Sequence, residues 1–381
     1  MSDTRIDFLY LNEKDMIDAG VLDAGHCVET MEEVLCLLAK GDVLMGGKNR
    51  REHGIQLIFP KESEIPGFPL EDSRDRRFMS MPAYLGGRFH LAGEKFYGSN
   101  GRNVRKGLPR SILMATLNDV ETGAPLAYMS ANLLSSMRTG AMPGLATKLL
   151  AREDSKVLTM LGAGPIAKAC FRAIMTNAKK IDTVKIKAGS LKSKTAAALK
   201  EFIETHYKQV KEVIICETLE EAVRGSDIIS ESVSVKPGQY PTYKKEWLKP
   251  GVTLIATSFF NMDKKELVGI RKVVDNWKMY EEYGIEDEEG YDENGMRKAT
   301  GCMGEEFYYM VEDGLITRDS IDHLGEIIRG KKPGRKSDDE IIFVAIEGMP
   351  IEDVAWGSEI YRNAVDHGIG TQLKIWDHSS R

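Results

Sequence analysis

The fold of this chain is decided by the stretch Lys156-Val-Leu-Thr-Met-Leu-Gly-Ala-Gly-Pro-Ile-Ala167, in which an apolar strand runs directly into a glycine-containing turn. Its small residues form a G-x-G-x-x-A pattern, and the sequence predicts a helix over 168–178. Gly162 permits a tight turn, Gly164 lets the backbone approach a pyrophosphate, and Ala167 lets the helix pack closely on the strand. The helix N-terminus would offer free N–H groups to the phosphates. We therefore predict a dinucleotide site, against the alternative of a tight turn in an ordinary α/β domain. Its predicted residues here are Gly162, Gly164, Pro165, Ile166 and Ala167.

The next predicted strand, 183–188, indicates which dinucleotide would bind. An NAD-binding domain usually places an acid at the end of this strand, against the ribose 2′-hydroxyl. Here the strand is followed by Gly189-Ser-Leu-Lys-Ser-Lys194, which contains no acid. Hydroxyls and positive charge suit a 2′-phosphate better than a bare ribose. NADP is therefore the expected cofactor and NAD the alternative, and a solvated basic loop is the competing interpretation. The candidate phosphate contacts are Ser190, Lys192 and Ser193.

Composition and charge narrow the class of protein. The 381 residues are 42% hydrophobic and 29% charged, as in globular proteins with room for two domains. A net charge of −6 argues against a nucleic-acid or anionic-membrane partner. Five cysteines without a C-x-x-C pair indicate reduced thiols, and seven scattered histidines show no metal-ligand spacing. No apolar signal core or membrane-spanning run is present, so we expect a cytoplasmic protein that binds no metal.

The first part of the chain is expected to be α+β with antiparallel strands. Apolar residues at helical spacing predict a helix over 28–38 that ends at Gly41. Strands are predicted at 55–59, 78–81, 94–97 and 111–118, and residues 121–127 resemble a hairpin turn with Gly123 as its permissive residue. Charged residues and prolines dominate 61–77, and 281–301 is strongly acidic before it turns basic. Both stretches are predicted to be loops or short mobile elements, and solvated surface segments are favoured over lids.

From Val157 onward, predicted strands alternate with helices, which is typical of a doubly wound parallel sheet. After about Ile316 the pattern changes again, to a helix over 351–367 closed by Gly368 and a short last strand at 373–376. The fold class is therefore α/β, with a Rossmann-type doubly wound parallel sheet. The strands assigned to this sheet besides 157–161 are 184–187, 212–216, 227–231, 252–257 and 272–275.

A second motif lies just before the dinucleotide turn. Leu133-Leu-Ser-Ser-Met-Arg-Thr-Gly-Ala141 resembles the L-T-x-x-R-T-x-A helix start of the ornithine cyclodeaminase/μ-crystallin family. The resemblance covers nearly the whole chain, and its strength lies in the joint order of motifs that are individually weak. The other matching segments are 81–84, Lys95, 122–127, 264–267, 274–275, 337–348, 352–354 and 367–370.

The resemblance implies a homodimer of two-domain subunits. Residues 1–137 and 317–381 would form an α+β substrate-binding and dimerisation domain, and residues 138–316 the Rossmann domain. Lys95 and Arg138 would hold the α-carboxylate of an amino or imino acid, the arginine in bidentate fashion and the lysine as a point charge that can also donate a proton. A surface lysine and a salt-bridged arginine are the alternatives. By position, Arg50 is the family's third basic residue, and Thr139, Ser232 and Val233 would contact the cofactor.

One departure from the family bears on the activity. Cyclodeaminases of the family carry an aspartate in a G-x-D-x-P-G-K-x-E-L segment, where it handles the substrate amine. Phe260 stands at that position here, and a phenyl ring neither accepts a hydrogen bond from an ammonium nor takes its proton. A shift of the loop could bring Asp263 into the site as a catalytic acid, but a turn or helix-cap role is an equal alternative. Ornithine cyclodeamination is thus disfavoured.

Family members without this aspartate are better described as reductases of imine-bearing carboxylates. The leading expectation is NADPH-dependent reduction of a small ketimine carboxylate, such as piperideine- or pyrroline-2-carboxylate, with Lys95 or a water as proton source. One alternative is an NAD(P)-dependent cyclodeaminase or amino-acid dehydrogenase that uses Asp263. Another is an NADPH-binding carrier or accessory subunit without turnover, in which Phe259 and Phe260 would suit an aromatic ligand.

Overall fold

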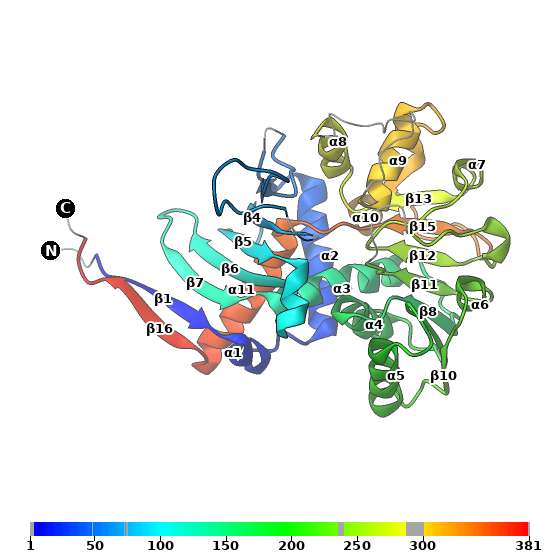
Figure 1. The fold of residues 1–381 in the computed structure, drawn as a ribbon, viewed down its shortest axis with the longest axis horizontal. Helices are drawn as coiled ribbons and strands as arrows, with labels where there is room; N and C mark the ends of the chain where they lie inside the picture. The colour runs from blue at the N-terminus through cyan, green and yellow to red at the C-terminus, as the bar shows by residue number, and fades with distance from the viewer. Residues whose placement is uncertain are drawn as a thin grey trace. The chain divides into compact units, whose positions relative to one another are not determined.

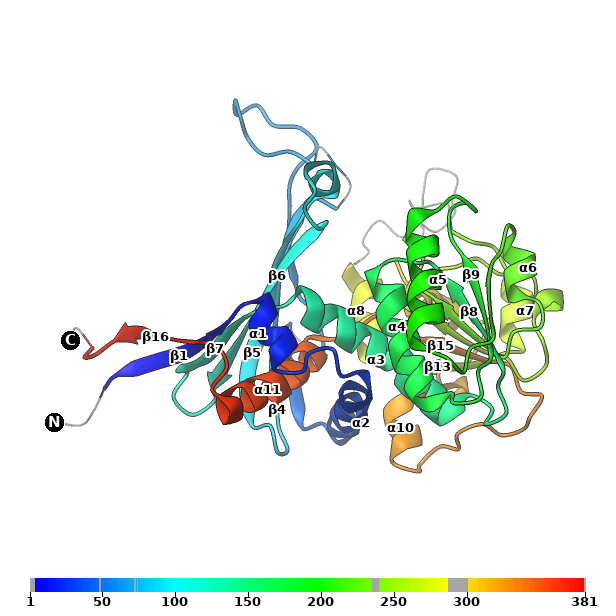
Figure 2. The same ribbon diagram turned by 90° about the horizontal axis from the view of Figure 1, so that it is seen from below.

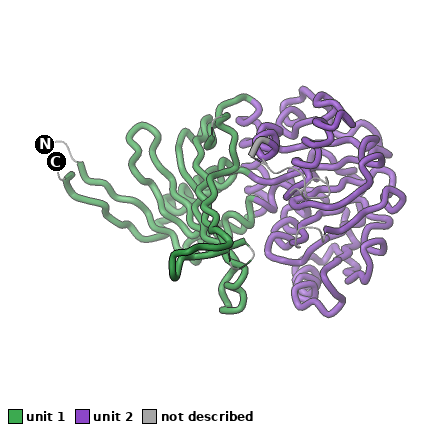
Figure 3. The backbone as a smooth tube through the Cα atoms, turned by 45° about the horizontal axis from the view of Figure 1, so that its top comes forward, with its two compact units in different colours: residues 1–23, 40–138, 349–381 green, residues 24–39, 139–348 purple. Residues whose placement is uncertain are grey.

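The computed structural model describes residues 4–47, 49–71, 73, 75–234, 240–286 and 301–379. The chain divides into two compact units (Figure 3). Unit 1 comprises Met1–Asp23, Lys40–Arg138 and Met349–Arg381, and unit 2 comprises Ala24–Ala39 and Thr139–Gly348. Each unit is built on one eight-stranded sheet. Within the described residues, no helix combines the length and the hydropathy needed to cross a membrane.

Unit 1 is a mixed sheet with one long helix on its buried face. The strands follow the order β16-β1-β7-β6-β5-β4-β2, and β3 also pairs with β4. Only the β1–β7 pair is parallel among these described strands. Figure 1 shows β1 and β16 side by side, leading to both ends of the chain. The elements are β1 (Ile6–Leu11), α1 (Glu13–Asp18), β2 (Val43–Met45), β3 (Ile55–Ile58), β4 (Arg77–Leu85), β5 (Leu91–Ser99), η1 (Gly101–Lys106), β6 (Ser111–Asp119), β7 (Pro125–Ser130), α11 (Pro350–His367) and β16 (Thr371–Trp376).

The alternation of side chains along β4 to β6 decides which face of this sheet is buried. Met81 lies opposite Lys95, which lies opposite Ala115, and all three side chains are buried. The helix α11 packs against β4, β5 and β6 (Figure 1). It begins at Pro350, whose missing N–H needs no partner there, and it is closed by Gly368 with a φ of 65°. Lys95 therefore belongs to the buried face of the sheet.

Unit 2 confirms the predicted doubly wound parallel sheet. Its strand order is β10-β9-β8-β11-β12-β15-β13-β14, and every pair is parallel. Figure 2 shows α4 and α5 running along this sheet. The elements are α2 (Ala24–Lys40), α3 (Asn132–Leu150, which begins in unit 1), β8 (Val157–Leu161), α4 (Pro165–Asn177), β9 (Thr183–Lys187), α5 (Lys194–His206), β10 (Glu212–Ile215), α6 (Leu219–Val223), β11 (Ile228–Glu231), η2 (Lys245–Trp247), β12 (Thr253–Ala256), α7 (Lys264–Val268), β13 (Arg271–Val274), α8 (Trp277–Glu286), α9 (Met303–Glu312), η3 (Arg318–Ser320), β14 (Ile321–His323), α10 (Leu324–Ile328) and β15 (Ile342–Ala345).

The division into domains differs from the sequence prediction at two places. Residues 24–39, which the prediction assigned to the substrate-binding domain, belong to unit 2. The Rossmann segment continues to Gly348 rather than ending at 316, because β14 and β15 add two parallel strands to its sheet. In the polar stretch 281–301, α8 extends to Glu286, and 287–300 lie outside the described residues. In the polar stretch 61–77, the described residues contain no helix or strand until β4 begins at Arg77.

Helices α3 and α4 approach each other so closely that only glycine fits at two positions of α3. A Cβ atom on Gly140 would lie 2.4 Å from the backbone carbon of Ala169, and one on Gly144 would lie 2.7 Å from the Cβ of Ala173. Both contacts are shorter than van der Waals distance. The helix that follows the dinucleotide turn is therefore held against α3 by backbone contact.

We expect Gly140→Leu to destabilise the protein, because overpacking a closely packed interface costs about 1–3 kcal/mol. Chemical denaturation measures the free energy of unfolding. Ala197→Leu, which adds a similar side chain at an exposed position of α5, is the matched control and should cost far less. Equal stability of Gly140→Leu and the native chain would contradict the close packing.

Candidate functional site

The turn between β8 and α4 has the backbone conformation that its glycines predict. Gly162 adopts a φ of 98°, and a Cβ atom there would lie 2.8 Å from the carbonyl oxygen of Ser232. Gly164 is the extended N-cap of α4, its Cβ position faces open space, and Pro165 begins the helix. Ala167 is buried. The turn thus leaves room for a phosphate in front of the first N–H groups of α4, so these residues fit a dinucleotide.

The strand order of unit 2 also indicates a ligand site at the carboxyl end of β8. From β8 the chain adds β9 and β10 on one side, whereas β11 and β12 lie on the other, so the order reverses between β8 and β11. In open parallel sheets, ligands bind outside the carboxyl ends of the strands at such a reversal. Ser232 lies there, and both its N–H and its hydroxyl donate to the Leu161 carbonyl, at 2.9 and 3.3 Å. Val233 follows it, with its N–H donating to Glu231 at 2.8 Å.

The residues after β9 divide into two groups. Ser190 and Lys192 are exposed and remain the predicted contacts of a 2′-phosphate. Ser193 instead is the N-cap of α5, where its hydroxyl accepts a hydrogen bond from the N–H of Ala196 at 3.3 Å. The Ser193 hydroxyl thus has a structural role, because a capping hydroxyl satisfies a helix N–H that would otherwise lack a partner. Its contact with the cofactor stays a prediction.

Unit 1 contains a buried cluster of four charged side chains and one hydroxyl. Lys95 of β5 donates to Asp353 at 2.8 Å and to Ser135 at 3.2 Å. Arg138 of α3 donates from Nε to Asp353 and from Nη1 to Glu352, both at 3.0 Å. None of the four charged side chains is more than 5% exposed. The two basic residues that the resemblance singled out are thus brought together.

The cluster is electrically balanced, which explains how it can be buried. Two cations face two carboxylates, and an unpaired charge at such a depth would cost several kcal/mol. Burial alone would lower the pKa of Arg138, but the carboxylates of Asp353 and Glu352 raise it above its usual value. Burial alone would raise the pKa of Asp353, but Arg138 and Lys95 hold it below the usual value. Both ion-pair partners therefore stay charged.

Lys95 differs from Arg138 and Asp353, because its pKa shifts toward neutral pH. Burial, and next the positive charge of Arg138, lower the pKa of its ammonium to about 8, despite the opposing effect of Asp353. An ammonium offers three donors, of which Ser135 and Asp353 engage two. Lys95 can therefore both bind an anion and exchange a proton near neutral pH.

Three members of this cluster had no role in the sequence prediction: Ser135, Glu352 and Asp353. The sequence carries a signal for the acids, because an acidic pair stands between Ile351 and Val354 at the start of a helix that is otherwise largely apolar. Its partners cannot be found in this way, since Lys95 and Asp353 are 258 positions apart.

Three predicted site residues lie elsewhere. Arg50 is exposed, with a left-handed φ of 59°, and the structure does not join it to Lys95 and Arg138. Phe260 is only 1% exposed and packs edge-on against Tyr243 and Phe343 inside unit 2, so its predicted contact with substrate is wrong. Asp263 is exposed and caps α7 by accepting the N–H of Lys265 at 2.8 Å, which is the capping alternative that the sequence left open. Thr139, which follows Arg138, is half-buried.

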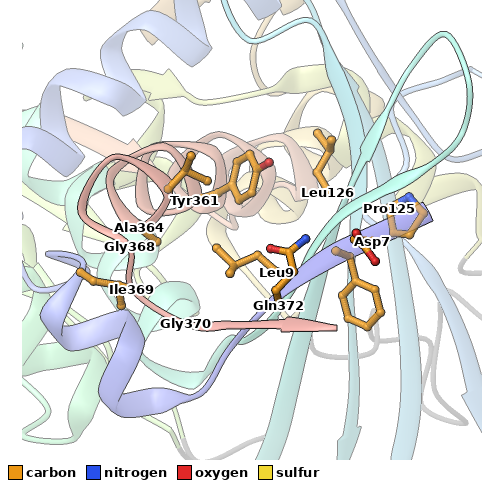
Figure 4. A pocket seen from close by; sticks show the side chains of 12 residues that line it. Asp7, Leu9, Pro125, Leu126, Tyr361, Ala364, Gly368, Ile369, Gly370 and Gln372 are labelled. Carbon is orange, nitrogen blue, oxygen red and sulfur yellow. The ribbon is translucent and has the colours of Figure 1, made fainter. Parts of the chain in front are cut away.

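A cavity of about 350 Å³ in unit 1 is not part of this cluster (Figure 4). Residues of β1, the start of β7, the end of α11 and the turn into β16 line it, among them Asp7, Tyr361 and Gln372. None of the cluster residues lines the cavity. Within the described part of the chain, no three His, Cys, Asp or Glu side chains are placed to hold a metal ion.

Known proteins resemble this chain in sequence and in fold. The model of the ornithine cyclodeaminase/mu-crystallin family matches residues 22–368. N-((2S)-2-amino-2-carboxyethyl)-L-glutamate dehydrogenase of Staphylococcus aureus is 27% identical, over 97% of this chain and 99% of that protein. Delta(1)-pyrroline-2-carboxylate reductase of Bacillus thuringiensis is 29% identical, over 68% of this chain and 73% of that protein. An archaeal alanine dehydrogenase dimer, solved with bound NAD, superposes with a TM-score of 0.75 at 27% identity, covering 97% of this chain and all of that one.

Proposed function

Because this chain belongs to the ornithine cyclodeaminase/mu-crystallin family, we propose that it is an NADPH-dependent reductase of a small imine carboxylate, with NADH as the alternative donor. Piperideine- and pyrroline-2-carboxylate represent this substrate class. The observation that carries the proposal is the buried cluster of unit 1, in which Lys95 and Arg138 lie side by side around Asp353. A substrate carboxylate is the kind of anion that such a pair of cations recognises.

In this proposal the protein contributes binding, orientation and a proton. Reduction adds a hydride to the imine carbon and a proton to its nitrogen, and the bound dihydronicotinamide supplies the hydride. Arg138 holds the carboxylate, since its ion pairs with Asp353 and Glu352 fix the plane of the guanidinium. Lys95 is the proton source, because burial brings the pKa of its ammonium to about 8.

The relatives support the chemistry but differ in substrate. Their names include a dehydrogenase of an N-substituted glutamate, an alanine dehydrogenase and a pyrroline-2-carboxylate reductase. In each compound, nitrogen is bound to the carbon next to a carboxylate, and that C–N bond is oxidised or reduced. An amino-acid dehydrogenase is thus the second candidate, since it would run the same reaction in the other direction. The cyclodeaminase alternative has less support, because Asp263 caps a helix and Phe260 is buried. Phe259 and Phe260 are both buried, which also leaves the carrier alternative with less support, since it used these rings for an aromatic ligand.

The first experiment follows NADPH oxidation by the purified protein with a panel of cyclic and open-chain imino acids. NADH is run in parallel, and ornithine, alanine and proline are tested with oxidised cofactors. We expect a cyclic ketimine carboxylate to oxidise NADPH faster than NADH, because Ser190 and Lys192 are available to a 2′-phosphate. Saturable NADPH binding without turnover of any compound would contradict the reductase proposal.

Lys95→Met tests the role of the ammonium. We expect kcat/KM to fall by about 10²–10⁴, the usual contribution of a positioned acid, while the Kd for NADPH stays unchanged. For the native protein, reduction should slow as the pH rises through about 8, because Lys95 then loses its proton. Lys106→Met, which removes an exposed lysine of η1, is the control. Unchanged turnover in Lys95→Met would exclude this role.

We further propose that the chain forms a homodimer through the face of the unit 1 sheet that lies opposite α11. Strand register places Leu57 opposite Phe78 and Phe96 opposite Met114 on that face, and Ile112 lies opposite Gly98. The side chains of Leu57, Phe78, Phe96 and Ile112 are 37–55% exposed. An antiparallel sheet with one solvated face would carry polar residues there, so the apolar residues indicate a partner surface. The related alanine dehydrogenase is described as a dimer.

Sedimentation velocity tests this proposal. We expect the native chain to sediment as a dimer and Phe96→Glu to sediment as a monomer, because a buried unpaired carboxylate would destabilise the interface. Ile17→Glu introduces the same charge at an exposed position of α1 and should leave the dimer intact. A native monomer at micromolar concentration would refute the proposal.

A further inference from the structure

Unit 2 contains a buried carboxyl group, that of Glu231, that has no counter-ion among the described residues. Glu231 is the last residue of β11, beside the end of β8 at the point where the strand order reverses, and its side chain is fully buried. Among the described residues, no lysine, arginine or histidine forms an ion pair with it. A buried carboxylate without a cation is costly, and such a group usually becomes neutral instead.

The hydrogen bonds around Glu231 indicate which form it takes. Its Oε1 accepts the N–H of Val233 at 2.8 Å. The hydroxyl of Ser258 lies 2.6 Å from Oε2 and 3.0 Å from the carbonyl oxygen of Val233. A serine hydroxyl has one hydrogen, yet both of these neighbours are acceptors when Glu231 is ionised. An ionised Glu231 would therefore leave one of the two contacts without its hydrogen.

A protonated Glu231 satisfies every contact. The acid donates from Oε2 to the Ser258 hydroxyl, and Ser258 donates to the carbonyl of Val233. The N–H of Val233 still donates to Oε1, which closes a ring of three hydrogen bonds. This ring joins the residues that follow β11 to those that follow β12. It also fixes Ser232 and Val233, the predicted cofactor contacts, from the side of the protein interior.

Among the described residues, the titratable groups on which Glu231 acts are neutral ones. They are Cys170 of α4 and Tyr243, and burial raises the pKa of Cys170 to about 12 and that of Tyr243 well above its usual value. Tyr243 is also buried with no hydrogen-bond partner for its hydroxyl among the described residues. Burial raises the pKa of Glu231 to about 7, although Ser258 and the N–H of Val233 act to lower it. The proton can therefore be lost within the physiological range.

We infer that Glu231 is a protonated positioning residue that ties the loop after β11 to the loop after β12, and that its ionisation favours the oxidised over the reduced nicotinamide cofactor. This inference rests on the proposed function, in which the carboxyl edge of β8 and β11 receives the cofactor. The oxidised nicotinamide ring carries a positive charge and the reduced ring does not. A buried negative charge at this edge attracts the oxidised ring, and water screens that attraction only weakly.

Infrared difference spectroscopy of the cofactor-free protein tests the protonation by itself. Subtracting the spectrum of Glu231→Gln from that of the native chain should show a carboxylic acid C=O band at about pH 6 that disappears with a midpoint near 7. Glu204→Gln, at an exposed position of α5, controls for an ordinary carboxylate. Absence of the acid band at every pH overturns the inference.

Cofactor titrations test the second part. Because the pKa of Glu231 without cofactor is about 7, a bound oxidised ring that lowers this pKa by one unit or more should make the Kd of the oxidised cofactor fall about five- to tenfold between about pH 6 and pH 8.5. The Kd of the reduced cofactor should not fall in the same range. Glu231→Gln keeps all three hydrogen bonds, since its amide can donate to Ser258 and accept from Val233, and it should abolish the pH dependence.

The outcomes separate this inference from the proposed function. An acid band together with the same pH dependence in the native chain and Glu231→Gln overturns the link to the cofactor and leaves the reductase proposal intact. An acid band and a pH-dependent cofactor affinity without imine reduction support the inference and overturn the reductase proposal.

Discussion

The constraint on which unit 1 depends is the burial of four charges at one point. Lys95, Arg138, Glu352 and Asp353 come from β5, α3 and α11, and the cations and carboxylates pair with one another. Removing one partner from such a group leaves a buried charge, which costs about 3–5 kcal/mol. The cluster therefore specifies how the sheet, the start of α3 and the last long helix come together. It also leaves a lysine whose ammonium can lose its proton near neutral pH.

Unit 2 depends on a different constraint, which is a set of glycine positions where no side chain fits. Gly162 lies against Ser232, and Gly140 and Gly144 lie against the backbone of α4, at distances that exclude a Cβ atom. Close backbone contact fixes the turn and the helix that follow β8, and it leaves the front of Gly164 open. A phosphate can approach the helix N-terminus for the same reason that α3 can approach the helix: no side chain intervenes.

Asp353 and Glu231 show two ways of burying a carboxyl group. Asp353 of unit 1 keeps its charge because Arg138 and Lys95 surround it, so its pKa is lowered. Among the described residues, Glu231 of unit 2 has only neutral donors, so burial prevails and its pKa is raised. A charged cluster suits the binding of a charged ligand, whereas a group that can lose its proton near pH 7 suits a response to the charge of a ligand.

By itself, the sequence determined the features that depend on neighbours along the chain. The glycine turn at 162–167, the strands around it, and the caps at Gly41 and Gly368 follow from local spacing and backbone freedom, and the structure contains all of them. The sequence also singled out Lys95 and Arg138 through a family resemblance. Only the tertiary structure placed Asp353 between them, put β14 and β15 into the parallel sheet, and buried Phe260 in the core. Those outcomes depend on contacts between residues far apart in the chain, which local spacing does not encode.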